Sequence, residues 1–447
     1  MPQSRRTFLR VGISSLAYFT VESTTPSWIV RAANAMSCNC TCDGRILVIL
    51  QLAGGNDGLN TVIPRTDPVY YDSLTRPNIR VASGSEINLD GANGLHPKLS
   101  DVANWFQSGH AAIINNVGYV NPDLSHFTST DYYETGSVPG QIKPTQGWVA
   151  RYYDSACVGA ADSNALFMTA AGISSVPGSF AGPTSYTPPA VSSASSYSLQ
   201  ASSDGTLRRA AITALNAAPT VDPDLMFIQR TENTAEASIA DIATAAAQPA
   251  LVPAGSYTTD SLGNGLKLVS QVIRAGFPTR VFYVSQSGYD THATQVQAAD
   301  PLNLGDHPRL LGNLNQSLHA FLTEMQLSGN LNRVLVMTFS EFGRRVKENS
   351  SFGTDHGAAN NMFLLGGWLN SGVYGGQPDL VNLIKGNLKH QVDFRSVYAM
   401  VMEQWLSASA VPVFGQSVYD TVLQPDFAKI NFVKTASAAA RNWEHYQ

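Results

Sequence analysis

The sequence is poor in charged residues. Asp, Glu, Lys and Arg make up 14% of its 447 residues, against roughly 25% in ordinary soluble domains. The formal net charge is -5; residues 1–35 carry four Arg and one Glu (4 - 1 = +3), so the remainder carries -8 (-5 - 3). An acidic surface argues against nucleic acid or an anionic membrane as the main partner. An acidic surface does not argue against a small anionic substrate, because cationic side chains in a binding site can bind such a substrate.

Cysteine is also scarce. Of the four cysteines, Cys38, Cys40 and Cys42 form a C-x-C-x-C run and Cys157 stands alone. No histidine lies near the run, so the pattern does not favour a metal or redox cluster. In an oxidising compartment, disulfides among the four are an open alternative. We interpret these thiols as structural or incidental.

The N-terminus carries the most specific pattern. The run Ser4-Arg5-Arg6-Thr7-Phe8-Leu9-Arg10 matches the twin-arginine signal. The apolar stretch from Val11 to Val21 is too short and too polar to span a bilayer, which takes about 20 apolar residues. Ala33-Asn34-Ala35 offers a cleavage site. We expect a signal peptide over 1–35 and a flexible leader over 36–44. The twin-arginine translocase would then deliver a folded periplasmic or secreted protein with no stable membrane anchor; a chance double arginine is the alternative.

Five apolar runs follow, each suited to a strand buried on both faces of a parallel sheet. They cover residues 45–52, 111–117, 280–285, 333–338 and 362–365. Helix-like spacing of apolar residues lies between them, over 97–109, 262–275 and 308–329. This alternation predicts an α/β protein with a doubly wound, largely parallel sheet over residues 45–435. Residues 160–260, rich in Ser, Ala and Pro, are interpreted as an inserted cap of loops and a few helices.

Ionisable side chains follow the predicted strands. They are Asp57, Ser125-His126, Asp290, His292, Glu341 and Arg344, while Asp355-His356 comes just before the fifth run. In open α/β sheets, ligands bind beyond the carboxyl ends of the strands. Because these residues come from distant segments and gather at one edge, they predict a metal or acid–base centre.

Each motif also has a plainer interpretation. Asp57 could belong to a tight Asn-Asp-Gly turn, and Ser125 could cap a helix. Glu341 and Arg344 could form an ordinary ion pair. Asp290-x-His292 occurs often by chance. Asp355-His356 is hardest to explain structurally, since a buried strand rarely begins with two adjacent ionisable groups. His96, Asp306 and His307 could join the site or cap helices.

The motifs together resemble the domain of unknown function 1501 family over about residues 45–430. They are LAGGNDGLN from Leu52, Ser125-His126-Phe127, GYDTH from Gly288, FSEFGR from Phe339 and Thr354-Asp355-His356-Gly357. That family resembles the alkaline phosphatase and sulfatase superfamily, whose members bind two divalent metals at the carboxyl edge of a parallel sheet. A Ser, Thr or modified Cys there attacks phosphorus or sulfur.

The resemblance implies a role for each residue. Asp57 and Glu341 would hold one metal, with Phe342 standing where a histidine is expected. Asp290, His292 and His356, next to Asp355, would hold the other.

Ser125 would be the nucleophile, His126 a proton shuttle and Arg344 a ligand for anionic oxygens. The sulfatase Cys-x-Pro-x-Arg signature is absent, which argues against a formylglycine mechanism.

The resulting hypothesis is an exported metal-dependent hydrolase of small anionic phosphate or related esters. Zn²⁺ would suit the histidines, and Mg²⁺, Ca²⁺ or Mn²⁺ an oxygen-rich second site. Two alternatives remain: an inactive exported binding protein on the same fold, and a structural exported protein whose Ser/Ala-rich middle mediates assembly.

Overall fold

The computed structural model describes residues 44–156, 168–182, 188–195, 197, 205–277 and 279–434. The predicted signal, almost all of the leader and the four cysteines lie outside these described residues. No helix within the described ranges is both long and apolar enough to cross a membrane.

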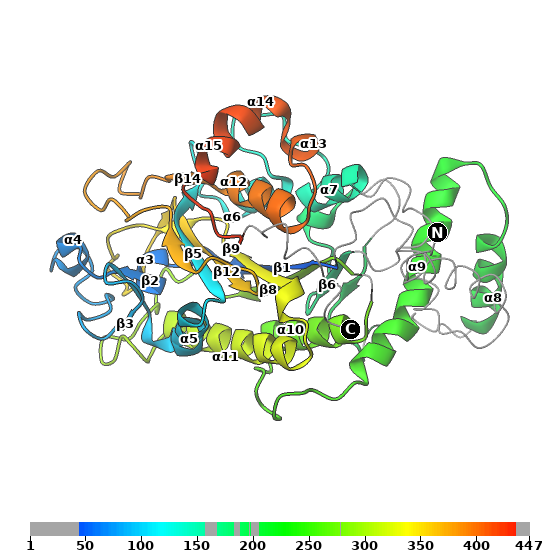
Figure 1. Ribbon diagram of the computed structural model, residues 1–447, viewed down its shortest axis with the longest axis horizontal. Coiled ribbons are helices and arrows are strands. Elements are labelled where there is room, and N and C mark those ends of the chain that lie inside the picture. The colour runs from blue at the N-terminus through cyan, green and yellow to red at the C-terminus, as the bar shows by residue number, and fades with distance from the viewer. Residues whose placement is uncertain are drawn as a thin grey trace, which may run out of the picture.

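A mixed sheet of nine strands forms the centre of the described chain (Figure 1). In spatial order its strands are β13 (Gly372–Tyr374), β5 (Ala111–Gly118), β12 (Asn360–Gly366), β9 (Val334–Phe339), β1 (Ile46–Ala53), β8 (Val281–Ser287), β6 (Met168–Ala171) and β7 (Ala190–Val191), with β14 (Val392–Asp393) also on β5. All neighbouring strands are parallel except β12, which is antiparallel to both β5 and β9. The predicted α/β fold with a largely parallel sheet is confirmed.

The central strands are apolar throughout because both of their faces are covered. Along β1, Ile46, Val48 and Leu50 pack into one hydrophobic core, and Leu47 and Ile49 pack into the other. Alternate side chains of a strand point to opposite faces, so a strand between two cores needs no polar positions. The five apolar runs predicted as strands are β1, β5, β8, β9 and β12.

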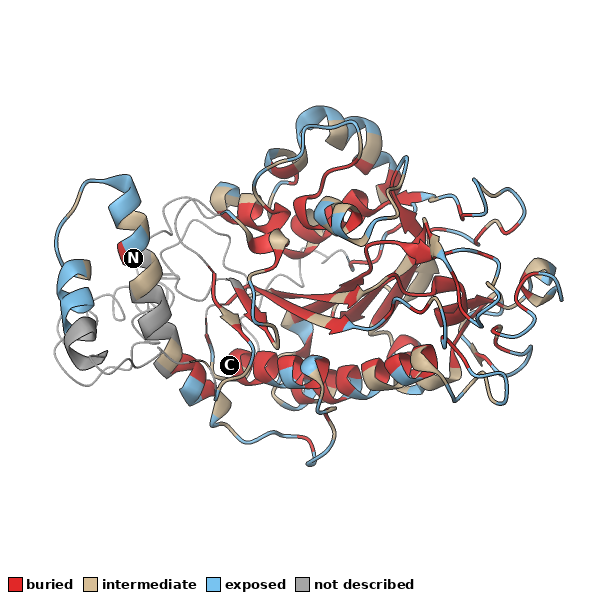
Figure 2. Cartoon of the chain, turned by 180° about the vertical axis from the view of Figure 1, so that it is seen from behind, coloured by how far each residue is buried: buried red, intermediate tan, exposed pale blue. Residues whose placement is uncertain are grey.

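Helices cover both faces of the sheet (Figures 1 and 2). One face carries α5 (Ser100–Gln107), α10 (Ser261–Arg274) and α11 (Asp306–Leu327), which are the three predicted helices. The other carries α6 (His126–Thr135), α7 (Trp148–Ala156) and α12 (Phe394–Met400). Figure 2 shows buried residues concentrated in the sheet and on the inner sides of these helices.

The region predicted as an insertion contributes to the main sheet. Its strands β6 and β7 extend the sheet beyond β8, and neither was expected from the sequence. Its helices α8 (Gly205–Asn216) and α9 (Pro223–Ala246) extend away from the sheet at one end of the molecule (Figure 1).

The direction of β12 decides which residues meet. Because β12 runs against β5 and β9, its first residues lie at the edge where those strands end. The segment before β12 forms β11 (His356–Gly357), which pairs with β10 (Gly343–Arg344), the segment that follows β9. His356 therefore reaches the carboxyl edge of the sheet from the amino end of its own strand.

Candidate metal centre

Asp290, just after β8, is surrounded by three imidazoles and one guanidinium. Its Oδ1 lies 2.8 Å from Arg344 Nη2, 3.1 Å from His356 Nε2 and 3.2 Å from His292 Nε2. Its Oδ2 lies 3.4 Å from His126 Nε2. Segments from four parts of the chain therefore converge on one carboxylate, as the sequence predicts.

The other ring nitrogen of each histidine faces an oxygen. His126 Nδ1 lies 2.9 Å from Glu341 Oε1, and His356 Nδ1 lies 2.8 Å from the Leu124 carbonyl oxygen. His292 Nδ1 makes a longer contact of 3.5 Å with Asp355 Oδ1. Carbonyl and carboxylate oxygens accept hydrogen bonds, so we assign the proton of each ring to Nδ1. Each Nε2 then presents a lone pair to the cluster.

These lone pairs are crowded together. The Nε2 atoms of His292 and His356 are 2.9 Å apart, and both lie near Asp290 Oδ1. Ligand atoms of His126, Asp290 and His356 all lie within 4.8 Å of one another. Facing lone pairs repel unless a cation or proton lies between them. Ligands about 2.0–2.1 Å from one ion stand roughly 3.3 Å apart, so the donors of His126, Asp290 and His356 fit a metal such as Zn²⁺. His292 lies beside them through its contacts with His356 and Asp290.

The cluster is open to solvent. The exposed fractions of its side chains are 47% for Asp290, 45% for His292, 34% for His126 and 20% for His356. Structural zinc sites are closed, whereas catalytic sites keep a position open for water or substrate. The exposed side of the cluster is therefore accessible to water or a small molecule.

The surroundings of the cluster lower the pKa values of both Asp290 and His356. Burial alone would raise the pKa of Asp290, but the hydrogen bond from Arg344 and the contact with His356 lower it to about 2. Burial lowers the pKa of His356, and its contacts with Leu124 and Asp290 only partly oppose this. The anionic carboxylate and neutral imidazole are the forms that bind metals.

Arg344 is bound to the protein through all three of its guanidinium nitrogens. Its Nε donates to Gly55 O (2.6 Å), its Nη1 to Thr354 O (2.9 Å), and its Nη2 to Tyr289 O, Gly54 O and Asp290 Oδ1. A guanidinium has five donors, and the residue is buried. Arg344 fixes Asp290 and the surrounding loops. Its side chain is 0% exposed, which does not favour the anion contact expected from the sequence.

Glu341 contacts the cluster through His126, at the ring nitrogen that does not face Asp290. Its Oε1 accepts from the Gly54 amide at 2.8 Å and from His126 Nδ1 at 2.9 Å. Gly54 has φ +122°, and a Cβ there would stand 2.3 Å from the Asp290 amide nitrogen. Gly54 is therefore required by close backbone approach, which goes beyond the turn interpretation.

Phe342 forms an aromatic wall beside the cluster. It is buried, and its ring centroid lies 4.4 Å from that of His356 and 4.9 Å from that of His126. It contributes no metal ligand where the family resemblance leads one to expect a histidine.

Asp57 lies outside the cluster. Its carboxylate, 1% exposed, accepts from Arg76 Nη1 at 2.7 and 3.0 Å and from Gln295 Nε2 at 2.6 Å. Neither Arg76 nor Gln295 was singled out from the sequence, since nothing in their surroundings marks them. A metal-ligand role for Asp57 stays a prediction, and our proposal below does not use it.

Ser125 precedes α6 as its N-cap residue. It is exposed, its side chain makes no capping hydrogen bond, and its amide donates to Asp123 Oδ1 at 2.7 Å. Ser125 therefore holds the N-cap position that the plainer interpretation gives it, without the capping hydrogen bond, and it directly precedes His126 in the chain.

The remaining candidates do not join the cluster. His307 is buried, with Nε2 3.0 Å from Asn56 Oδ1, and burial lowers its pKa to about 4. His96 caps the short 3-10 helix Pro97–Leu99. Asp306 begins α11 and pairs with Arg309 at 2.9 Å.

The family is decided by sequence comparison. A family profile described as "Protein of unknown function (DUF1501)" matches residues 45–399. The chain belongs to this family. No curated protein matches this DUF1501 chain.

Three solved structures illustrate what the DUF1501 chain is similar to. A protein in the alkaline phosphatase superfamily from Vibrio parahaemolyticus is 9% identical, with a TM-score of 0.34, covering 83% of this chain and 71% of that one. The lipoteichoic acid synthase LtaP from Listeria monocytogenes is 9% identical (TM-score 0.28, 85% and 79% covered). Alkaline phosphatase from the Antarctic bacterium TAB5 is 13% identical (TM-score 0.26, 72% and 92% covered).

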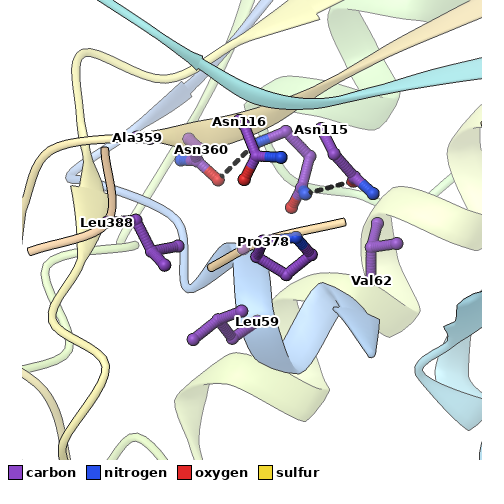
Figure 3. A pocket seen from close by; sticks show the side chains of 10 residues that line it. Leu59, Val62, Asn115, Asn116, Ala359, Asn360, Pro378 and Leu388 are labelled. Carbon is purple, nitrogen blue, oxygen red and sulfur yellow. Dashed lines mark hydrogen bonds between the residues drawn. The ribbon is translucent and has the colours of Figure 1, made fainter. Parts of the chain in front are cut away.

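A small pocket of the DUF1501 protein lies near the start of β12 (Figure 3). Its volume is about 10 Å³, room for about one water molecule. The ten residues that line it are uncharged: Gly58, Leu59, Val62, Asn115, Asn116, Ala359, Asn360, Asn361, Pro378 and Leu388. With no acid, base or cation in its walls, this pocket does not offer the chemistry that the Asp290 cluster offers.

Proposed function

We propose that this protein is an exported metal-dependent hydrolase of phosphate or related esters. The observation that carries the proposal is the convergence of three imidazole Nε2 atoms on the Asp290 carboxylate, each ring held from behind by an oxygen. In metal sites such outer oxygens fix the tautomer and orientation of the ligand histidines.

In this proposal His126, Asp290, His292 and His356 hold one divalent ion. The ion, when bound, acts as a Lewis acid on a phosphoryl or similar oxygen. With Nε2 as a ligand and Nδ1 on Glu341, His126 is not the proton shuttle. We assign it to the metal.

Ser125 is the proposed nucleophile. Its hydroxyl oxygen forms a bond to phosphorus while the bond to the leaving alcohol breaks, and its proton passes through water to the departing oxygen. Water then cleaves the phosphoserine, releasing phosphate and restoring the hydroxyl. Ser125 stands at the N-terminus of α6, where the partial positive charge of the helix favours an anionic group.

The test combines metal analysis with turnover. Purified mature protein should retain stoichiometric metal and hydrolyse an aryl phosphate or a phosphodiester. His356→Ala and Asp290→Asn should lose both properties. His319→Ala, a half-exposed histidine of α11, is the matched control and should lose neither. A metal-free wild-type protein in which added metal restores no turnover would refute the proposal.

Phe342 favours one other candidate, an exported binding protein on the same fold. Its apolar ring stands at the position where the family resemblance leads us to expect a metal-binding histidine. Stoichiometric metal without turnover of any phosphate or sulfate ester would support that alternative.

A further inference from the structure

Asp57 and Arg76 form a second charged centre near the edge of the sheet, wholly enclosed by protein. The side chains are 1% and 0% exposed. Arg76 Nη1 contacts both carboxylate oxygens of Asp57, and Gln295 donates to the second of them. The Asp57 carboxylate is therefore already neutralised and hydrogen-bonded.

The guanidinium of Arg76 is itself fixed on all sides. Its Nε donates to Val346 O at 2.6 Å, its Nη2 to Arg345 O at 2.7 Å, and its Nη1 also to Asn60 Oδ1 at 3.0 Å. These partners come from α3 (Gly58–Thr61) and from the loop after β10. Moving Arg76 away would leave a charged group and two carbonyl oxygens buried without partners, which is costly.

The electrostatics favour one cation at Asp57. Burial alone would raise the pKa of Asp57, but the charge of Arg76, with smaller contributions from His307 and Gln295, lowers it. A divalent ion bound to the same carboxylate would stand within a few ångströms of the guanidinium. Like charges at about 4 Å repel by several kcal/mol at an effective dielectric constant of 20.

The other ligands expected for a second metal are also committed. Glu341 Oε1 accepts from Gly54 and His126, its Oε2 faces Ser340 Oγ at 3.4 Å, and Phe342 offers only a ring. The described residues near Asp57 therefore fit an internal ion pair and do not fit a second metal.

We infer that the centre takes a single divalent ion, and that Arg76 supplies at Asp57 the positive charge that a second metal would otherwise supply. This inference rests on the proposed metal centre around Asp290. Asp57 and Arg76 then stabilise the loops that carry the centre and contact neither metal nor substrate.

The experiment counts metal ions in the whole mature chain. Metal-free protein is titrated with Zn²⁺ in a calorimeter, and the reconstituted protein is measured by elemental analysis; one ion per chain is expected. Reconstitution with Mn²⁺ followed by electron paramagnetic resonance should give the spectrum of an isolated ion. Neither measurement needs a variant, so a folding defect cannot obscure the answer.

Two variants distinguish the role of the Asp57 carboxylate from that of the Asp290 carboxylate. Asp57→Asn keeps the shape of the side chain and should bind one Zn²⁺ with affinity within threefold of wild type, while its midpoint of thermal unfolding falls because Arg76 loses its counterion. Asp290→Asn should weaken Zn²⁺ at least tenfold. Two ions per chain, a coupled Mn²⁺ pair, or loss of Zn²⁺ from folded Asp57→Asn would overturn this inference and leave the hydrolase proposal standing. No bound ion would overturn both.

Discussion

Glu134 should make the protein less stable at neutral pH than at acidic pH. It lies in α6, the helix that begins with His126, and is 9% exposed. Burial raises its pKa to about 7 from an ordinary value of 4.5. The negative charges of Asp131 and Glu341 add to this rise, and hydrogen bonds from Tyr283 (3.2 Å) and the Gly178 amide oppose it.

The sign follows from comparing the folded and unfolded chains. As pH rises through 4.5, Glu134 ionises in the unfolded chain first, so folding loses free energy until the folded carboxyl ionises near pH 7. A difference of about 2.5 pKa units corresponds to roughly 3 kcal/mol. Glu134→Gln removes this penalty but keeps only one of two acceptors, which costs about 1 kcal/mol. The variant should be more stable than wild type by about 2 kcal/mol at pH 8.

Urea unfolding at pH 4.5 and pH 8 measures this difference directly. The advantage of Glu134→Gln should vanish or reverse at pH 4.5, where the folded carboxyl is protonated and the unfolded one is only half ionised, so the penalty is mostly absent. Asp420→Asn, an exposed carboxyl on the same face of the sheet, is the control and should show no comparable dependence on pH. An equal effect of Glu134→Gln at both pH values would refute the reasoning.

Three further substitutions test the proposed metal centre and the export of the protein. Glu341→Gln should weaken Zn²⁺ binding about 10- to 100-fold by loosening His126, measured by competition with a chromophoric chelator; unchanged affinity would remove Glu341 from this role. Arg344→Lys should lower both the unfolding midpoint and the metal affinity, because an ammonium has three donors against five; a Lys variant equal to wild type in both would contradict the role given to the guanidinium. Replacing Arg5 and Arg6 by Lys should retain the protein in the cytoplasm, as followed by cell fractionation, and normal export would exclude the twin-arginine route.

The sequence predicts the central strands and the cluster because both follow from local patterns. Continuous apolar runs identify strands between two cores, and polar residues at their ends indicate the functional edge. No sequence pattern predicts that β12 runs antiparallel to its neighbours, because the apolar run of a short buried strand does not indicate the direction of the strand. His356 was placed correctly although its strand runs opposite to the direction assumed.

Pairings across long distances could not be predicted. Arg76 has no feature that assigns it to Asp57, since their contact depends on how the segment from α3 to Arg76 folds back. Likewise, the bonds from Arg344 to backbone carbonyls depend on three loops meeting. The short strands β6 and β7 lie among Ser, Ala and Pro with no regular period, so their neighbours in the sheet, and not their sequence, select the extended conformation.

One side chain, Arg344, ties together the loop after β1, the loop after β8 and the approach to β12. The same loops also bond to one another directly, from the Tyr289 amide to Ala53 O at 3.1 Å and from the Thr354 amide to Thr291 O at 3.3 Å, so we expect them to order together. In the proposed centre, a chain in which these loops have ordered would present Asp290, His292 and His356 to the ion together. Under the proposed function, metal loading would then report that this part of the fold is complete before export.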